Sequence, residues 1–242
     1  MTRTMKPSPR LSVALLLASV CCSGVASAHG LWIEQTGKTK TLFYGEPAGP
    51  KKETFPGKLE NIKAPQATAV LKDGARQEAK VTRGANGFDL GVSAPSQSML
   101  AMETTLEVKD GSKSEMGQFK PMYYARFAAA PLVAAKPELK LDVTPTATAG
   151  RFTVSFDGRP LKAAAVDLIA PNTWVKSFKT DEQGQIQVQT PWRGQYVIEV
   201  IHFDKTPGEY QGKKFEGARH RTMLTFAQPV GEVVSRLTLP KE

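Results

Sequence analysis

The 242-residue sequence contains three histidines, His29, His202 and His220, and these are its best candidates for binding chemistry. Imidazole nitrogen is a ligand that Cu, Ni, Co and Zn all accept. The two cysteines, Cys21 and Cys22, both precede His29. Histidine is therefore the side chain from which a transition-metal site would be built.

The first 28 residues have the pattern of an export signal. Basic residues precede the apolar stretch 11–22, and Ala26-Ser27-Ala28 places small residues at both positions that a signal peptidase inspects. The stretch is too short to span a membrane, which takes about 20 residues. We expect a signal peptide over residues 1–28, cleavage after Ala28 and a periplasmic location. The alternative is a lipoprotein modified at Cys21 or Cys22, which is disfavoured because neither cysteine follows a suitably small residue.

Cleavage after Ala28 would change both the charge and the chemistry of the chain. It removes three basic residues and no acidic one, so the net charge falls from +9 to +6. It also removes both cysteines, which excludes disulfides and thiolate ligands. His29 becomes the first residue, and its free amine and its ring Nδ1 can close a chelate ring on a metal near pH 7. The alternative is that cleavage falls before a histidine by accident.

The rest of the sequence predicts an all-β protein. No segment keeps an apolar spacing of 3.6 residues, whereas 20 Gly and 17 Pro divide the chain into short runs. Residues 152–156 alternate apolar and polar, and Asp157-Gly158 is a typical hairpin turn. An Ala-rich stretch with two prolines, near residues 128–137, resembles a linker. We expect two β-sandwich domains, at residues 29–130 and 137–242.

Strand alternation suggests where two of the histidines lie. Residues of equal parity share one face of a strand, so His202 shares a face with the apolar residues before it, and His220 with those after it. If the two strands pair antiparallel with His202 opposite His220, Val200 faces Thr222 and Tyr196 faces Phe226, and the apolar faces match. Directly opposed Cβ atoms are about 5 Å apart. The two imidazoles could then share one metal ion.

The predicted metal site combines this pair with the N-terminus. With His29 folded against the same edge, the site would hold three imidazoles and one amine, and Cu(II) would bind most tightly among the divalent ions. Asp204 and Glu209 are candidates to orient the imidazole rings from a second layer. The sequence leaves the choice among Ni, Co and Cu open. A surface histidine or a hydrogen-bonded strand histidine is the alternative reading of His202 and His220.

Several motifs together resemble known families. The order DGRPLKAAAVDLIAP, TDEQGQIQV and RGQYVIEV, within residues 157–200, is similar to the transthyretin-like, Ig-like sandwich module. With the start His29-Gly30-Leu31-Trp32 and the loop and strand of residues 204–226, the chain resembles an uncharacterised-domain family labelled as the periplasmic component of cobalt or nickel uptake. The resemblance implies a non-enzymatic protein that binds a divalent transition metal and passes it to an inner-membrane metal transporter.

Two other functions remain open from the sequence. A copper oxidative enzyme of the histidine-brace type would use the same N-terminal histidine, and an Ig-like adhesion or scaffold module would need no metal. The sequence has no nucleophile elbow and no phosphate-binding loop. We expect no nucleic-acid partner, because a positive charge in an exported protein fits solubility or an anionic membrane surface. Trp32, Trp174 and Trp192 are expected in the core or at a sandwich edge.

Overall fold

The computed structural model describes residues 29–49 and 52–234, and these residues confirm an all-β protein. Apart from strands, this part of the chain forms two short 3-10 helices, Lys58–Asn61 and Ser112–Ser114. The expected signal peptide, its cleavage site and the alternative lipid-modified cysteines lie outside the described residues.

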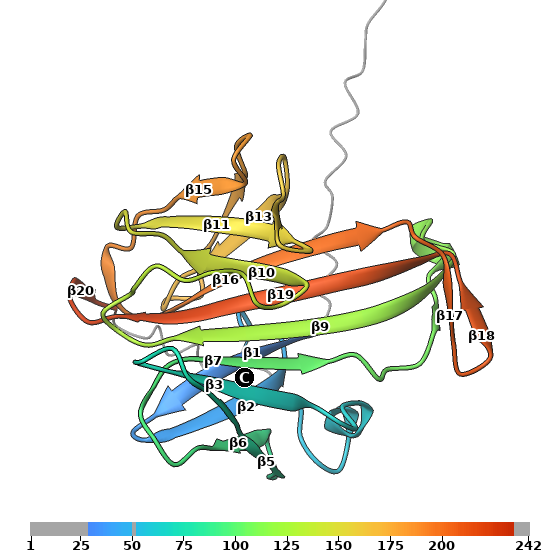
Figure 1. Ribbon diagram of the computed structural model, residues 1–242, viewed down its shortest axis with the longest axis horizontal. Coiled ribbons are helices and arrows are strands. Elements are labelled where there is room, and N and C mark those ends of the chain that lie inside the picture. The colour runs from blue at the N-terminus through green and yellow to red at the C-terminus, as the bar shows by residue number, and fades with distance from the viewer. Residues whose placement is uncertain (1–28, 50–51, 235–242) are drawn as a thin grey trace, which may run out of the picture.

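A ten-stranded central sheet organises the molecule (Figure 1). Its strand order is β14-β13-β16-β19-β9-β7-β3-β4, with β8 beside β9 and β20 beside β16. The strands are β3 (Gln66–Leu71), β4 (Arg76–Glu78), β7 (Ser96–Glu103), β8 (Lys109–Asp110), β9 (Gln118–Ala128), β13 (Ala165–Ile169), β14 (Val175–Lys179), β16 (Trp192–Asp204), β19 (Gly217–Gln228) and β20 (Glu232–Val233). Strands β9 and β19, from the two halves of the chain, pair in parallel at the centre.

Smaller sheets cover the two faces of the central sheet, which makes three layers (Figure 1). One face carries the sheet of β1 (Gly30–Thr36), β2 (Thr39–Gly45), β6 (Phe88–Gly91) and β5 (Lys80–Arg83). The other carries β10 (Leu141–Pro145), β11 (Arg151–Phe156), β12 (Arg159–Pro160) and β15 (Gln185–Gln187). We call these the β1 face and the β10 face. A separate ribbon of β17 (Gly208–Tyr210) and β18 (Lys213–Phe215) projects from one end of the molecule.

Strand alternation sends neighbouring side chains of the central sheet into two different cores. In β9, Tyr123 and Phe127 pack into the core on the β1 face, whereas Tyr124 and Ala128 pack into the core on the β10 face. A strand buried on both faces reads as a nearly continuous apolar run rather than as an alternation. The main cluster on the β1 face is built from residues 31–127, but the β10-face core takes Leu100, Tyr124 and Ala128 from the first half, and Trp32 packs with Val197 and Met223 of the second. The two expected halves therefore share both a sheet and parts of their cores.

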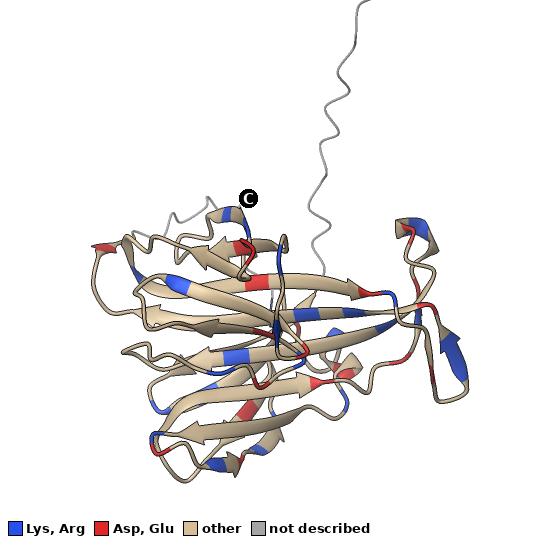
Figure 2. Ribbon diagram, turned by 45° about the horizontal axis from the view of Figure 1, so that its top comes forward, with Lys and Arg blue, Asp and Glu red and all other residues tan. Residues whose placement is uncertain are grey.

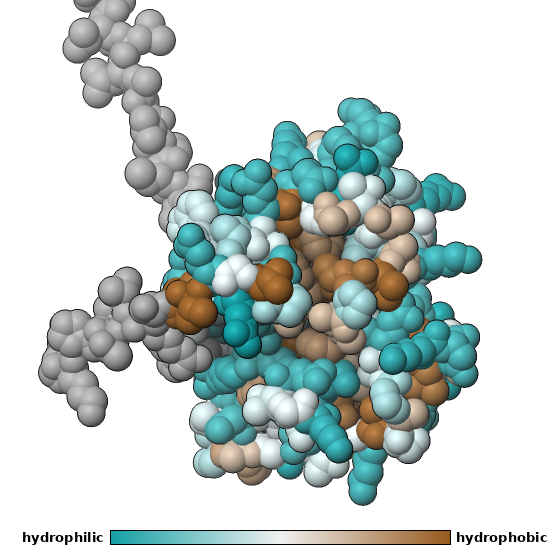
Figure 3. Space-filling view, turned by 90° about the vertical axis from the view of Figure 1, so that its left-hand side faces the viewer, coloured by the Kyte–Doolittle hydropathy of each residue, from teal (hydrophilic) through white to brown (hydrophobic). Residues whose placement is uncertain are grey.

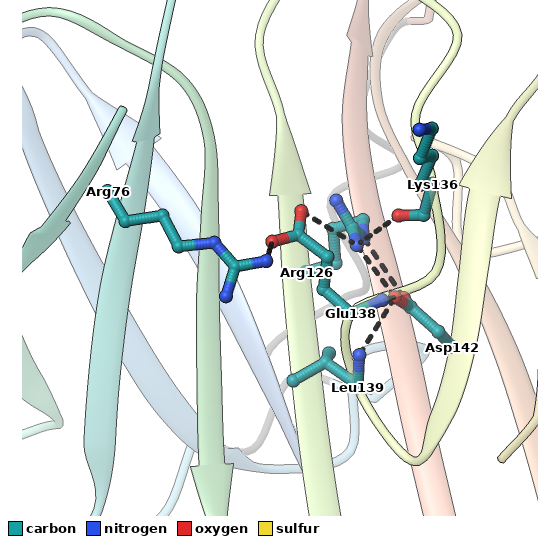
Figure 4. Close-up of polar contacts among 6 residues, drawn as sticks. All are labelled: Arg76, Arg126, Lys136, Glu138, Leu139 and Asp142. Carbon is teal, nitrogen blue, oxygen red and sulfur yellow. Dashed lines mark hydrogen bonds and ion pairs between the residues drawn. The ribbon is translucent and has the colours of Figure 1, made fainter. Parts of the chain in front are cut away.

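The junction between the halves is held by a buried ion pair (Figure 4). Arg126 Nε and Nη2 donate to the two carboxylate oxygens of Asp142 at 3.0 and 2.6 Å, and both side chains are buried. Arg126 also donates to the carbonyl of Lys136 at 3.3 Å, and Asp142 accepts from the backbone N–H of Glu138 at 2.9 Å. Glu138 in turn pairs with Arg76 of β4. The stretch expected to be a linker is therefore fixed to β9 by paired charges, which are costly to separate once buried.

The register predicted for the histidine-bearing strands is confirmed. Strands β16 and β19 pair antiparallel with His202 opposite His220, Val200 opposite Thr222 and Tyr196 opposite Phe226. The hairpin turn predicted at Asp157-Gly158 is also present, with positive φ angles of 52° and 74°.

Candidate functional site

His29 lies at the start of β1, between two carboxylates. Its Nε2 is bonded to Glu53 Oε1, and since a carboxylate only accepts, Nε2 is the donor. Its Nδ1 lies 3.8 Å from Glu46 Oε1. The imidazole packs on Tyr44, with ring centroids 5.3 Å apart, and its side chain is 22% exposed. The two ring nitrogens therefore face two different carboxylates.

The β1–β2 hairpin positions His29 among these groups. Antiparallel pairing sets Gly30 opposite Gly45, so His29 meets the residues that follow β2. The backbone N–H of Glu53 donates to Tyr44 O at 2.8 Å, which returns the chain to the ring. A Cβ on Gly30 would lie 2.5 Å from Met223 Cε and 2.9 Å from Arg221 Nε. A glycine is needed here because β1 presses directly against β19.

Two arginines of β19, the buried Arg221 and the half-buried Arg219, lie on the same face of the central sheet as this end of β1. Arg221 pairs with Glu199 of β16, yet burial still raises the pKa of Glu199 above its usual range. Burial, followed by the charge of Arg221, lowers the pKa of Arg219. Within the described residues, Arg221 Nε and Nη1 have no hydrogen-bond partner. The β1 face is therefore strongly charged at the level of His29.

His202 and His220 lie on the β10 face of the sheet, where His220 is buried and His202, like His29, is half-buried. The ring of Phe156 from β11 packs against both imidazoles, with centroids 4.5 Å from His202 and 5.0 Å from His220. His220 is 1% exposed, and its Nδ1 shares a hydrogen bond of 3.0 Å with the hydroxyl of Tyr124. His220 Nε2 is buried without a partner among the described residues.

The surroundings keep the paired imidazoles neutral. Burial, followed by the charge of Lys140, lowers the pKa of His220 to about 4. Burial also lowers the pKa of His202, against the opposing charge of Asp204. A neutral imidazole can bind a metal, but the nearby ammonium of Lys140 disfavours a second cation. The observed contacts of His220 are those of a core residue.

The structure does not bring His29 to this pair. The backbone at Gly30 contacts Arg221 and Met223 of β19, and these side chains point away from the face that carries His220. A single centre made of all three imidazoles is therefore not assembled, because the central sheet separates them. This corrects the expectation that His29 folds against the strand pair.

The two expected orienting carboxylates also differ in position. Asp204 lies at the end of β16 next to the pair, where its Oδ1 accepts from the backbone and the hydroxyl of Thr206 at 3.0 and 2.7 Å. These bonds lower the pKa of Asp204. Glu209 is exposed on the β17–β18 ribbon.

Sequence reasoning did not single out Glu46 and Glu53. A hairpin centred on Gly37-Lys38 sets residue 30 opposite residue 45, and this register alone would have placed Glu46 beside His29. No sequence pattern predicted that Glu53 would contact the His29 ring. Its place depends on the backbone hydrogen bond from the Glu53 N–H to Tyr44 O, which lies outside the regular pairing of the hairpin.

Within residues 29–49 and 52–234, no group of three or more His, Cys, Asp or Glu side chains is suited to hold a metal ion. Beside the His29 ring, the described carboxylates are those of Glu46 and Glu53. The same residues contain no helix long and apolar enough to cross a membrane.

Comparisons with known proteins leave the family open. No family model matches the chain, and no curated protein matches it. One solved structure aligns with it, from a work entitled "Structural insight into host cell surface retention of a 1.5-MDa bacterial ice-binding adhesin". The alignment has 11% identity and a TM-score of 0.23, and it covers 85% of this chain and 65% of that chain. A likeness this weak carries no argument about function, and the resemblance to the cobalt- and nickel-uptake family stays a prediction.

Proposed function

We propose that the exported protein captures a divalent transition metal, Cu, Ni or Co, at His29 and passes it to a transporter in the inner membrane. The single observation that supports the proposal is the setting of the His29 ring. Glu53 accepts from Nε2, and Nδ1 faces Glu46 at 3.8 Å. The function proposed is transport and requires no catalytic residue.

The orientation of the ring favours chelation by His29. A carboxylate that accepts from the far ring nitrogen fixes the tautomer and makes the other nitrogen a better ligand. After cleavage following Ala28, the α-amine of His29 would lie on the same residue as Nδ1. Amine and Nδ1 together close a six-membered ring on a metal ion, which neither the His202 nor the His220 side chain can do.

Glu46 supplies a third donor at a suitable distance. Metal–nitrogen and metal–oxygen bonds are about 2.0–2.2 Å long, so two donor atoms 3.8 Å apart can bind one ion. Two nitrogens and one oxygen suit borderline metals, and Cu(II) would bind most tightly. The side chains of His29 and Glu46 are 22% and 32% exposed, so a partner could reach the ion from solvent.

The decisive experiment alters the amine alone. The mature protein beginning at His29 is titrated with Cu(II), Ni(II) and Co(II) by calorimetry, beside the same protein with one glycine added before His29. We expect one strong site in the first protein and at least 100-fold weaker binding in the second, because the added residue removes the chelate.

A matched pair of side-chain variants locates the third ligand. Glu46→Gln should weaken binding, whereas Glu34→Gln should not, because Glu34 pairs with Lys52 at 2.6 Å and does not contact His29. Equal binding with and without the added glycine would refute the proposal. Loss of metal binding in His202→Ala would show that the metal binds at His202 and His220 and not at His29.

A further inference from the structure

The two ends of the central sheet differ sharply in charge. At one end, the segments 104–117 and 204–217 contain eleven charged side chains in 28 residues. They contact each other, since Tyr210 donates to Thr105 O at 3.1 Å and Lys213 lies 3.8 Å from Glu107. Figure 2 shows these charges at the right-hand end, around β17 and β18. We call this the charged end.

The opposite end is formed by five loops with few charges. The segments 129–133, 145–151, 170–175, 189–193 and 229–233 also total 28 residues, but they contain only three charged side chains, Arg151, Arg193 and Glu232. We call this the apolar end. It lies where β9 and β19 finish and β16 begins.

Exposed hydrophobic side chains gather at the apolar end. The described residues contain eight large hydrophobic residues that are well exposed, and five of them belong to its loops: Val133, Trp174, Val175, Val230 and Val233. Trp174 is 56% exposed, and Val230 and Val233 are 69% and 78% exposed. Such a concentration marks an interaction surface rather than the scattered exposure of ordinary proteins.

The end face is also hollowed. A groove of about 580 Å³ opens between segment 130–132, the 145–152 turn and the end of β19, and a second one beside it reaches Gln35 and Gly37 of the β1–β2 hairpin. Figure 3 shows the hollow and the apolar side chains around it. The charged residues that line the two grooves are Arg151 and Arg193. The hollow therefore combines apolar walls with positive charge alone.

The local backbone holds Trp174 outward. Thr173 has a φ of 65°, which is costly for a β-branched residue. The backbone N–H of Trp174 donates to Asn172 Oδ1 at 3.1 Å, and Ala170 N–H donates to Trp174 O at 2.9 Å. The exposed indole stands perpendicular to that of Trp192, with centroids 5.7 Å apart. The turn thus presents an aromatic ring to the surroundings instead of burying it.

We propose that the apolar end docks on the surface of a lipid bilayer with anionic headgroups. Tryptophan favours the membrane–water interface, and aliphatic side chains favour the acyl boundary. Arg151 and Arg193 would lie against the headgroups, and anionic lipid attracts such residues within about 10 Å. A protein partner is the less favoured occupant, because the lining of the two grooves supplies no carboxylate and the exposed apolar residues come from three separate segments rather than from one flat sheet face.

This docking is independent of the proposed metal site. Gln35 and Gly37 line the second groove, whereas His29 is at the other end of β1, about 20 Å away at 3.3 Å per strand residue. His29 would therefore face away from the bilayer and stay accessible. A protein could dock without binding metal, or bind metal without docking.

The test is flotation of the mature chain with vesicles. Vesicles of phosphatidylglycerol and phosphatidylethanolamine are compared with phosphatidylcholine alone. We expect the protein to float with the anionic vesicles, with at least tenfold less bound to phosphatidylcholine. Tryptophan fluorescence should shift to shorter wavelength on binding. Trp174→Phe should reduce the shift and leave only the part from the half-buried Trp192, because Trp32 is buried in the core.

Two matched triple variants distinguish binding through the apolar end from non-specific hydrophobic binding. The triple change Trp174→Ser, Val230→Ser and Val233→Ser should reduce binding at least tenfold. The control is Phe55→Ser, Met102→Ser and Ile201→Ser, which removes three exposed hydrophobic residues elsewhere and should leave binding unchanged. Circular dichroism checks that both variants fold.

A double variant tests how much the two arginines contribute to vesicle binding. Arg151→Gln with Arg193→Gln should lower binding to anionic vesicles several-fold and make it less sensitive to salt. Absence of flotation, equal loss in the control, or capture of a free fatty acid without vesicle binding would each overturn the proposal.

Discussion

The β1 face of the molecule holds an imidazole that solvent can reach, whereas the β10 face holds one, His220, that the core encloses. His29 lies between Glu46 and Glu53 on the β1 face, whereas His220 lies under Phe156 and bonds to Tyr124 on the β10 face. Arg221, beside His220 in the sequence, belongs to the face of His29. His29 and His220, on opposite faces of the central sheet, thus have opposite surroundings.

The comparison teaches that the partners of an imidazole decide its role. Carboxylates near His29 favour binding of a cation, and its partial exposure allows exchange. An aromatic ring, a hydroxyl and a nearby lysine at His220 instead favour a neutral side chain that packs. Successive residues of β19 point to opposite faces, so His220 and Arg221 belong to different environments. The predicted pairing of β16 with β19 is correct, yet it does not bring His29 to the other two histidines.

The largest expected effect comes from removing one imidazole from each face. His29→Ala should weaken metal affinity at least 100-fold, about 2.7 kcal/mol, and lower the free energy of unfolding by about 1 kcal/mol, because its bond to the buried Glu53 is lost. His220→Ala should lower the free energy of unfolding by about 3 kcal/mol, because it leaves a cavity and an unpaired Tyr124 hydroxyl, and leave affinity unchanged. Calorimetry and urea unfolding measure both. The reverse pattern would show that the roles of the faces are exchanged.

Acid should destabilise the β10 face through His220. The pKa of His220 is about 4 in the folded protein and about 6.5 when unfolded. Between these values the unfolded chain holds a proton that the folded chain lacks, so the free energy of unfolding falls as pH drops from 6.5 to 4, by up to about 3 kcal/mol. Urea unfolding from pH 4 to 8 should show a shallower dependence in His220→Gln. Parallel curves would mean that the folded protein can protonate this ring.

A smaller effect is expected from the carboxylate that orients His29. Glu53→Gln should weaken metal affinity about 10- to 100-fold, as for other partners of a ligating histidine. Glu60→Gln is the control, because Glu60 bonds to the backbone N–H of Gly57 and has no contact with His29. If both variants bind metal equally, the ring needs no orientation by Glu53.

The smallest effect tests the hydrogen bond within the enclosed pair. Tyr124→Phe should lower the free energy of unfolding by about 1 kcal/mol, the typical net value of one hydrogen bond. Metal affinity should not change. Nitrogen NMR of the imidazole would show whether Nδ1 loses its partner, and a metal effect without a stability effect would contradict this account of Tyr124.

The features predicted correctly from the sequence are those set by local pattern. Alternation and matched apolar faces were enough to place His202 opposite His220, because a slip of one residue would turn every apolar side chain of β16 to the wrong face. The all-β class and the Asp157-Gly158 turn follow from equally local signals. The hairpin at Gly37 could have added Glu46 to the site.

The remaining features depend on contacts between distant segments. The sequence of β9 contains no pattern that predicts its pairing with β19. The sequence therefore could not predict that both halves of the chain share one sheet, or which side chains lie on each of its faces. For the same reason His29 could be assigned a chemistry but not a location. Trp174 is exposed because of the strained turn at Thr173, which composition does not reveal.

The parallel join of β9 and β19 also sets the order in which the protein can assemble. Gln118 and Glu216, at the start of this join, are 98 residues apart, and β19 is the partner that closes the central sheet. During synthesis, one edge of β9 stays unpaired until residue 228 has emerged. Until then it offers backbone groups to any other strand. The chain is thus most vulnerable to aggregation late in its production, when a chaperone that shields β9 would be of greatest use.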